Sequence, residues 1–359
     1  MVSGAAVIAI PDRDCTLTLW LTGDSGTVVP GCGTYGIHLM VQKGVFLIQL
    51  HMRWKRGNRL RLADENGASP CVREILADVR ESFGVPVVPL LYRAYAVFPR
   101  FLELHWETFR PVVKSRQFFL LGARLAAECY TRAHNYFAVG NLDSNGLASS
   151  GNVTLPLGQV LDYYQYLDPL LLLIAAAQVQ AFEGPVGDAS SMAEPAQHPT
   201  FPVGPHLLSD EESTPPMQRI WDERRRLLEL AFTSDEHRAL ACWPEFYQSY
   251  WSALKSLIKS PLYTDCQYRM GESALKLARE LPVALETTVP QLLEAGLDDQ
   301  DMSSVARIND AFMQALTGLV LDVTFARIAS EGGTHKGPRP EDEKPGKATV
   351  PTGTPIRAA

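Results

Sequence analysis

The chain has 359 residues, of which 46% are apolar, enough to form one large domain or two packed units. Its formal net charge of -7 gives no electrostatic reason to expect a nucleic-acid partner. The 6 cysteines form no CxxC pair, which argues against a redox centre or zinc knuckle and suits a reducing cytoplasm. No run of 18 apolar residues is present, so we predict a soluble, cytoplasmic protein with no membrane contact.

Residues 1–61 alternate short apolar runs with glycine and threonine and end in a basic cluster. The pattern is strand-like, but nothing further along the chain would pair with such strands. Met52 stands directly before the region where the helical pattern begins. We therefore predict an N-terminal extension outside the main fold. Two origins stay open: residues 1–51 derive from a start assigned too far upstream, or they form a genuine small β extension.

The next region, residues 62–184, is predicted to be helical. Ser69 and Pro70 have the character of an N-cap and a first-turn proline, and Gly84 marks the end of that first helix. Apolar residues then recur at spacings of three and four along this region. The predicted helices cover residues 72–83, 90–113 with a kink or restart at Pro99, 118–132 and 170–182.

The remaining chain has three zones of different composition. Residues 185–216 are rich in Pro, Gly, Ser and acids, and are predicted to be a linker. Residues 217–330 return to a helical pattern. Residues 331–359 carry almost no large apolar side chain, so they cannot offset the entropy of ordering and are predicted to be a disordered tail.

An internal repeat relates the two helical regions. Residues 92–133 align without gaps on residues 237–278, an offset of 145, with 10 of the 42 positions identical. This period is too long for a solenoid, whose units run to roughly 20–50 residues. We therefore predict an all-α fold of two tandem helical repeats that pack as a pseudo-twofold dimer, with a ligand pocket between the halves.

Known nucleotide, metalloprotease and hydrolase motifs are absent from the sequence, and the histidines show no metal-ligand spacing. We therefore expect no metal site. The remaining chemistry lies in acids. Asp235 and Glu236 open a helix, where their ordinary role is to face the helix dipole. Asp168 precedes a proline as an N-cap would, and Asp322 lies in an apolar run where a buried acid needs a partner.

Several motifs occur in the same order in a known family. They include the segment from Arg93 to Pro99, Asp168-Pro169, the segment from Ala239 to Pro244, and Asp322-Val323-Thr324. With these motifs, residues 65–333 resemble the all-helical group I 2-haloacid dehalogenases, which act on D or on both D and L substrates. No single motif is specific, but their order over two repeats is.

The resemblance implies a helical pseudo-dimer, usually assembled as a homodimer, and hydrolysis without a cofactor. The implied substrate and partner is a small organic acid, a short 2-haloalkanoic acid. In that family an aspartate and an asparagine activate a water molecule. The water displaces halide directly from carbon 2, with inversion and no covalent intermediate.

Transferring the family's catalytic residues to this sequence leaves the register open. Without a gap, Glu236 falls on the catalytic aspartate and Asp235 on the preceding serine; with one inserted residue, Ser234 and Asp235 match directly. The family's asparagine falls on Asp168 after a one-residue gap, or on Leu167 without it. Aromatic positions of the substrate pocket are replaced here by Val87, Leu90, Leu170 and Leu316.

Three functions follow from this pattern. The first is a dehalogenase-like hydrolase with Glu236 or Asp235 as the base and Asp168 orienting the water. Two acids at these positions would repel each other, so one pKa should rise. The second is a helical protein that binds a small acid without this chemistry. The third is an alkylhydroperoxidase-like enzyme, against which the missing CxxC argues strongly.

Overall fold

The computed structural model describes residues 60–136, 155–188 and 194–330, residues 149 and 153, and the backbone of four strands within residues 1–51. The chain divides into two compact units, Met1–Asn58 and Arg59–Ala359. The predicted disordered tail at residues 331–359 lies outside the described residues.

The first unit contains two antiparallel hairpins. β1 (Ala5–Ala9) pairs with β2 (Thr16–Trp20), and β3 (Gly36–Gln42) pairs with β4 (Val45–His51). The strands thus pair with one another and need no partner further along the chain. An upstream start for residues 1–51 stays a prediction.

The second unit is helical throughout its described elements. Its first five helices are α1 (Pro70–Phe83), α2 (Leu90–Tyr95), α3 (Pro99–Val113), α4 (Arg116–Tyr136) and α5 (Leu157–Ala181). The other six are α6 (Pro215–Leu227), α7 (Asp235–Leu240), α8 (Pro244–Ile258), α9 (Pro261–Ala278), α10 (Val289–Glu294) and α11 (Asp299–Ser330). The predicted all-helical class is correct for this unit.

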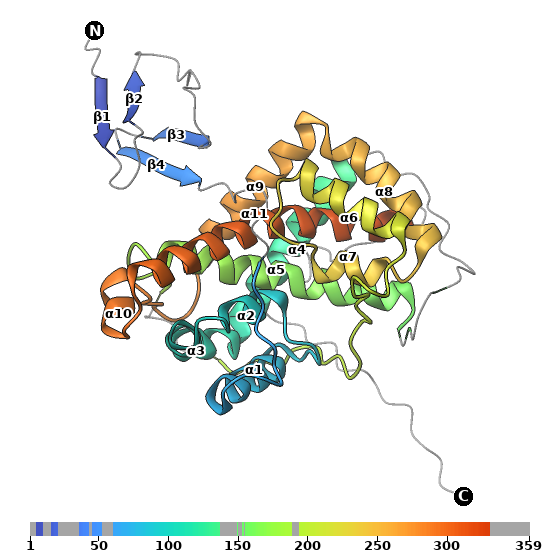
Figure 1. Ribbon diagram of the computed structural model, residues 1–359, viewed down its shortest axis with the longest axis horizontal. Helices are drawn as coiled ribbons and strands as arrows, with labels where there is room; N and C mark the ends of the chain where they lie inside the picture. The colour runs from blue at the N-terminus through green and yellow to red at the C-terminus, as the bar shows by residue number, and fades with distance from the viewer. Residues whose placement is uncertain are drawn as a thin grey trace, which may run out of the picture. The chain divides into compact units, whose positions relative to one another are not determined.

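Helices α5 and α11 form the centre of the helical unit and contact each other more extensively than any other pair of its helices. Figure 1 shows both running through the middle, with α1, α2 and α3 together on one side and α6, α8 and α9 on the other. Apolar side chains around most of the circumference of α5 explain its central place, since such a helix is stable only when surrounded by protein.

Local sequence signals explain several helix ends. Ser69 Oγ accepts the backbone N–H of Val72 at 3.3 Å and caps α1. Gly84 ends α1 at φ 64°, and a Cβ there would lie 2.4 Å from the carbonyl oxygen of Pro199, so only glycine fits. Pro99 starts a new helix, α3, as the restart predicted within residues 90–113.

The start of α5 differs from the prediction. The helix begins at Leu157, so Pro169 lies inside it and Asp168 is not an N-cap. An interior proline removes one backbone hydrogen bond and costs ~3 kcal/mol or more. Burial of the apolar side chains on both sides of Pro169 offsets this cost, because residues 170–177 are all at most 6% exposed.

Helix α11 is long and apolar enough to cross a membrane by length and composition alone, with a mean hydropathy of 1.3 over 18 residues. Within the helical unit, however, 72% of that window is buried. Its apolar character is therefore accounted for by its place in the core beside α5.

Similar contacts recur in the two halves. Trp106 donates its indole N–H to Asp78 at 2.9 Å, and Trp251 donates to Glu223 at 2.9 Å. Trp106 and Trp251 are 145 positions apart in the chain, and so are Asp78 and Glu223. The predicted linker has no helix between residues 194 and 214 and lies against the first half, where Phe201 donates its N–H to the carbonyl oxygen of Gly84 at 2.8 Å.

Candidate functional site

The short helix α7 carries the two adjacent acids predicted from the sequence. Ser234 is its N-cap by position, and its side chain makes no capping hydrogen bond. Asp235 and Glu236 follow in the first turn. Because successive residues of a helix point about 100° apart, the two carboxylates enter different surroundings.

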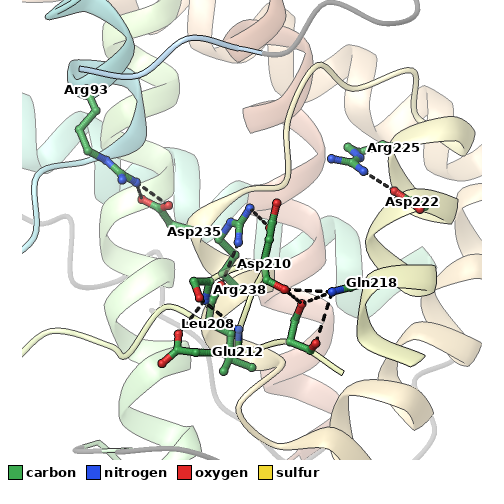
Figure 2. Close-up of polar contacts among 11 residues, drawn as sticks. Arg93, Leu208, Asp210, Glu212, Gln218, Asp222, Arg225, Asp235 and Arg238 are labelled. Carbon is green, nitrogen blue, oxygen red and sulfur yellow. Dashed lines mark hydrogen bonds and ion pairs between the residues drawn. The ribbon is translucent and has the colours of Figure 1, made fainter. Parts of the chain in front are cut away.

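The carboxylate of Asp235 is held by an arginine from the other half of the chain. Arg93, on α2, donates from Nη2 to both oxygens of Asp235, at 2.7 Å each (Figure 2). The side chains keep 22% and 14% of their exposure, so the pair is partly accessible to solvent. Burial raises the pKa of Asp235, while Arg93 and Arg238 oppose that rise.

Glu236 is less exposed to solvent than Asp235. The residue is 1% exposed, and neither carboxylate oxygen has a hydrogen-bond partner among the residues that the structure describes. Burial raises the pKa of Glu236 well above its ordinary value, Asp168 and Asp322 raise it further, and Arg224 opposes them. Both oxygens of this carboxyl group are therefore available to a water molecule or another polar ligand. The raised pKa favours its neutral, protonated form.

Asp168 reaches the same acid cluster from the middle of α5. It is 4% exposed, and its Oδ2 has no hydrogen-bond partner within residues 60–136, 155–188 and 194–330. Burial raises the pKa of Asp168 well above its ordinary value, and Asp235 and Asp322 add to the rise. The structure thus brings the three acids predicted as catalytic into one electrostatic cluster, although Asp168 is far from the other two in sequence.

A buried ion pair lies next to these acids. Arg224 on α6 donates from Nη2 to Oδ2 of Asp322 on α11 at 3.0 Å, and Tyr263 donates its hydroxyl to Oδ1 at 2.5 Å. Burial alone raises the pKa of Asp322, but His237, Arg224 and Tyr263 together lower it below its ordinary value. Asp322 therefore stays ionised and has the buried partner that the sequence predicts.

His237 completes this buried cluster. Its Nε2 lies 3.6 Å from Oδ2 of Asp322, and its Nδ1 lies 2.8 Å from the hydroxyl oxygen of Tyr247. Burial first, and then the positive charge of Arg224, lower the pKa of His237 to about 4. The imidazole is therefore neutral near neutral pH.

The sequence reasoning did not single out Arg224, His237 or Tyr263. A signal for Arg224 exists: Met217, Ile220 and Trp221 define the buried face of α6, and Arg224 continues that face at the same helical spacing. A charged residue at a core position requires a buried partner of opposite charge.

The predicted substrate-binding positions are spread over the unit. Ser234, Leu90 and Leu316 are 3%, 8% and 2% exposed, and Val87 is half-buried against Gly204. Leu170 instead lines an apolar cavity of about 290 Å³ between α4, α5 and α11. None of Asp168, Asp235 or Glu236 lines that cavity, whose walls include Phe119, Tyr166, Pro169, Leu170, Val320 and Thr324.

No group of three or more His, Cys, Asp or Glu side chains with the geometry of a metal site occurs among the described residues. Three arginines, Arg93, Arg224 and Arg238, and several tyrosines surround the acid cluster instead, and both residue types are donors suited to carboxylate oxygens.

The chain is similar in sequence to one family model and to two (R)-2-haloacid dehalogenases. A family model described as halocarboxylic acid dehydrogenase DehI matches residues 86–237. An (R)-2-haloacid dehalogenase of Pseudomonas putida is 25% identical over 279 residues, which is 74% of this chain and 91% of that protein. An (R)-2-haloacid dehalogenase of Rhizobium sp. (strain NHG3) is 23% identical over 232 residues, or 62% and 88% of the two proteins.

Solved structures give the same fold. A D-2-haloacid dehalogenase in complex with L-LA superposes with a TM-score of 0.68 at 24% identity, over 77% of this chain and 98% of that one. A mutant of a D-2-haloacid dehalogenase in complex with D-2-CPA superposes with a TM-score of 0.67 at 23% identity, over 82% of this chain and 100% of that one. The fold of the helical unit is therefore that of these proteins.

Proposed function

We propose that this chain, a relative of the all-helical 2-haloacid dehalogenases in sequence and fold, is a hydrolase that removes halide from a short 2-haloalkanoic acid. The observation that carries the proposal is the buried carboxyl group of Glu236. Both of its oxygens lack a partner within the described part of the chain, and the buried Asp168 lies in the same cluster. Such a group can accept a proton from a water molecule inside a dry site.

The reaction balances with water as the only co-reactant. Ionised Glu236 accepts a proton from water as the water oxygen forms a bond to carbon 2 of the substrate. The bond from carbon 2 to the halogen breaks, and the halide leaves with the electron pair. Attack opposite the leaving group inverts carbon 2, and the products are a 2-hydroxy acid and a halide ion. The proton then passes from Glu236 to solvent.

Glu236 is a better base than Asp235 in this geometry. Both oxygens of Asp235 already accept hydrogen bonds from Arg93, so they are less available to a water molecule. The oxygens of Glu236 make no such contact with a described residue. These contacts support Glu236 as the proposed base, which corresponds to the ungapped register of the resemblance.

Asp168 is assigned to orienting the water. Like-charged neighbours cannot easily ionise together, so the pair of Glu236 and Asp168 holds one proton over a range of pH. When that proton lies on Asp168, its carboxyl group has one donor and one acceptor. Those are the groups that an asparagine amide would offer to the same water.

The alternative function, binding of a small acid without turnover, rests on the aliphatic side chains at Val87, Leu90, Leu170 and Leu316. The relatives named above are dehalogenases and so favour the hydrolase. Measurement separates the two: binding of a 2-haloacid without halide release supports the alternative.

The finer architecture is part of the same proposal. Two tandem repeats, residues 62–184 and 217–330, joined by a linker at 185–216 and related by a pseudo-twofold axis, account for the equivalent contacts of Trp106 and Trp251. A homodimer in the cytoplasm is proposed from the family resemblance and the free cysteines. Sedimentation equilibrium of the full chain tests the dimer.

Halide release tests the function. The purified full chain is incubated with D-2-chloropropionate, L-2-chloropropionate and bromoacetate, and free halide is measured with an ion-selective electrode. Release above the rate in buffer, accompanied by the matching 2-hydroxy acid, supports the proposal. A folded protein that releases no halide from any of the three contradicts it.

A further inference from the structure

The proposed reaction does not use the apolar cavity of about 290 Å³ between α4, α5 and α11. The cavity faces away from the acid cluster on both central helices. Leu170 lines it and follows Asp168 by two positions in α5, which correspond to about 200° around a helix. Val320 lines it and precedes Asp322 by two positions in α11. The cavity and the acids therefore lie on different faces of the same two helices.

The cavity reaches from the surface to the core of the helical unit. Its most buried lining residues are Leu170, Val320 and Val323, which are at most 2% exposed. Other lining residues are accessible to solvent: Phe119 is half-buried and Ala123 is exposed. A ligand can therefore enter from solvent and bury most of its surface against α5 and α11.

Small residues on α4 leave room for a ligand. Gly122, Ala123 and Ala126 lie on one stripe of this helix, and all three line the cavity. A Cβ at Gly122 would lie 2.3 Å from Cδ2 of Leu170, so a side chain there would displace Leu170. Larger residues along this stripe would thus fill the space or change its wall.

Pro169 adds a polar group to this apolar wall. Because proline has no N–H, the carbonyl oxygen of Gln165, four residues earlier in α5, loses its usual helical partner. Gln165 and Pro169 both line the cavity. The carbonyl of a helical residue points towards the nitrogen four positions later, so this oxygen lies between the two lining residues. It is an acceptor that an N–H or O–H group of a ligand can use.

The lining also indicates the class of ligand. None of the described lining residues is charged, so an ionised ligand would lose hydration without gaining a counter-charge. A cavity of about 150 Å³ holds one benzene molecule, so 290 Å³ leaves room for two fused rings. Phe119 and Tyr166, whose rings are nearly parallel, supply aromatic surface that packs well with another aromatic ring.

We propose that this cavity is a second binding site, for a neutral bicyclic aromatic molecule whose single N–H or O–H group donates to the carbonyl oxygen of Gln165. The rings lie against Leu170 and the small residues of α4, where their burial removes apolar surface from water. The site is separate from the acid cluster, and the proposal does not depend on halide release.

Indole and 1-methylindole test the proposal as a matched pair. The two molecules are similar in shape, and only indole has an N–H donor. Titration calorimetry measures the binding of each to the full chain. We expect both to bind, and indole to bind about two- to tenfold more tightly, which is the effect of one hydrogen bond.

A variant that fills the cavity tests its location. Ala126→Phe places a ring inside the cavity and should weaken both ligands more than about tenfold. The control, Thr131→Phe, adds the same ring at an exposed position of α4 and should change either Kd less than about twofold. Circular dichroism of the ligand-free variants checks that each is folded.

Pro169→Ala tests the hydrogen bond and keeps the test decisive if Ala126→Phe does not fold. Alanine restores the N–H that pairs with the carbonyl of Gln165 inside the helix. Indole should then lose its advantage over 1-methylindole, while both molecules still bind.

Four results would each overturn the proposal. Neither molecule binds the wild-type chain, or folded Ala126→Phe binds indole as tightly as the wild-type chain does. Alternatively, 1-methylindole binds the wild-type chain as tightly as indole, or Pro169→Ala keeps the preference for indole.

Discussion

Arg224 and Asp322 form an ion pair at 3.0 Å between α6 and α11, with side chains that are 2% and 0% exposed. Tyr250 adds a hydrogen bond from its hydroxyl to the backbone carbonyl of Asp322 at 3.0 Å. The pair ties α6 to the central helix α11, directly beside the acid cluster. Its energetic role is to avoid unpaired buried charge rather than to add net stability.

Loss of one partner from this pair should strongly destabilise the helical unit. Asp322→Ala leaves the guanidinium of Arg224 buried without a counter-charge, and we expect the free energy of unfolding to fall by about 3–5 kcal/mol. Urea denaturation followed by circular dichroism measures the change. The control is Asp222→Ala, which breaks the more exposed pair with Arg225 on the same helix (Figure 2). That loss should stay below about 1 kcal/mol, and equal losses in the two variants would contradict the assigned role.

Substitution of each acid in turn distinguishes Glu236 from Asp235 as the base. Glu236→Gln keeps the shape of the side chain but cannot accept a proton, so kcat for halide release should fall by about 10²–10⁴-fold. Asp235→Asn should retain most of kcat, because Asp235 is bound to Arg93 and does not contact the water in this assignment. A larger loss of kcat in Asp235→Asn than in Glu236→Gln would move the base to Asp235.

The pH dependence of kcat should report the acid pair. Burial and Asp168 raise the pKa of Glu236, and the base acts only when ionised, so kcat should rise with pH through a pKa above the ordinary value of 4.5. Asp168→Asn removes one of the acids that raise this pKa. The rising limb of the profile should therefore move to lower pH in that variant. A limb that stays in place or moves to higher pH would show that Asp168 does not act on the base.

The same raised pKa has a consequence for stability. Neutral Glu236 contributes stability that is fully present below the pKa of the unfolded chain and is lost as pH rises through the higher pKa of the folded state. Glu236→Gln has no such loss. The melting temperature of Glu236→Gln, measured relative to that of the wild-type chain, should therefore increase from pH 4 to pH 8. A difference in melting temperature that does not change with pH would contradict burial of the ionisable group.

Asp78, in the first half of the chain, has a lowered pKa, in contrast to the raised pKa of Glu236. Burial tends to raise its pKa, but hydrogen bonds from Arg110, Lys114 and Trp106 lower it to about 2. The stabilisation from ionised Asp78 is then present above the unfolded pKa of 3.8 and is lost as pH falls towards 2. Asp78→Asn should destabilise the chain by about 1–2 kcal/mol at pH 7, and by much less at pH 2. Urea denaturation at both pH values measures the difference.

The sequence predicted the helical class of the second unit and its resemblance to the dehalogenases because both depend on local patterns. Apolar spacing, proline at helix starts and the order of short motifs are all visible without coordinates. The strand-like pattern of residues 1–51 is likewise local, and it matches the two hairpins. The choice of base between Asp235 and Glu236 cannot be made from local patterns and stays a prediction; the structure adds that Asp235 is bound by Arg93.

Asp168 shows where local reasoning failed. A residue before proline is usually outside a helix, so Asp168 was expected at an N-cap. In α5 the burial of a long apolar segment outweighs this preference, and the acid lies mid-helix inside the core. The Arg224–Asp322 pair was missed for a related reason: its residues are 98 positions apart, and only the packing of α6 against the centre of the unit brings them together.

The most direct test of the account is a single turnover of D-2-chloropropionate in water enriched in oxygen-18, with the full chain in excess over substrate. Direct attack by a water molecule activated by Glu236 predicts one oxygen-18 atom in the lactate of that first turnover, measured by mass spectrometry. Unlabelled lactate, with the label on a carboxylate of the protein after that turnover, would mean that a side chain attacks carbon 2 and would contradict the account.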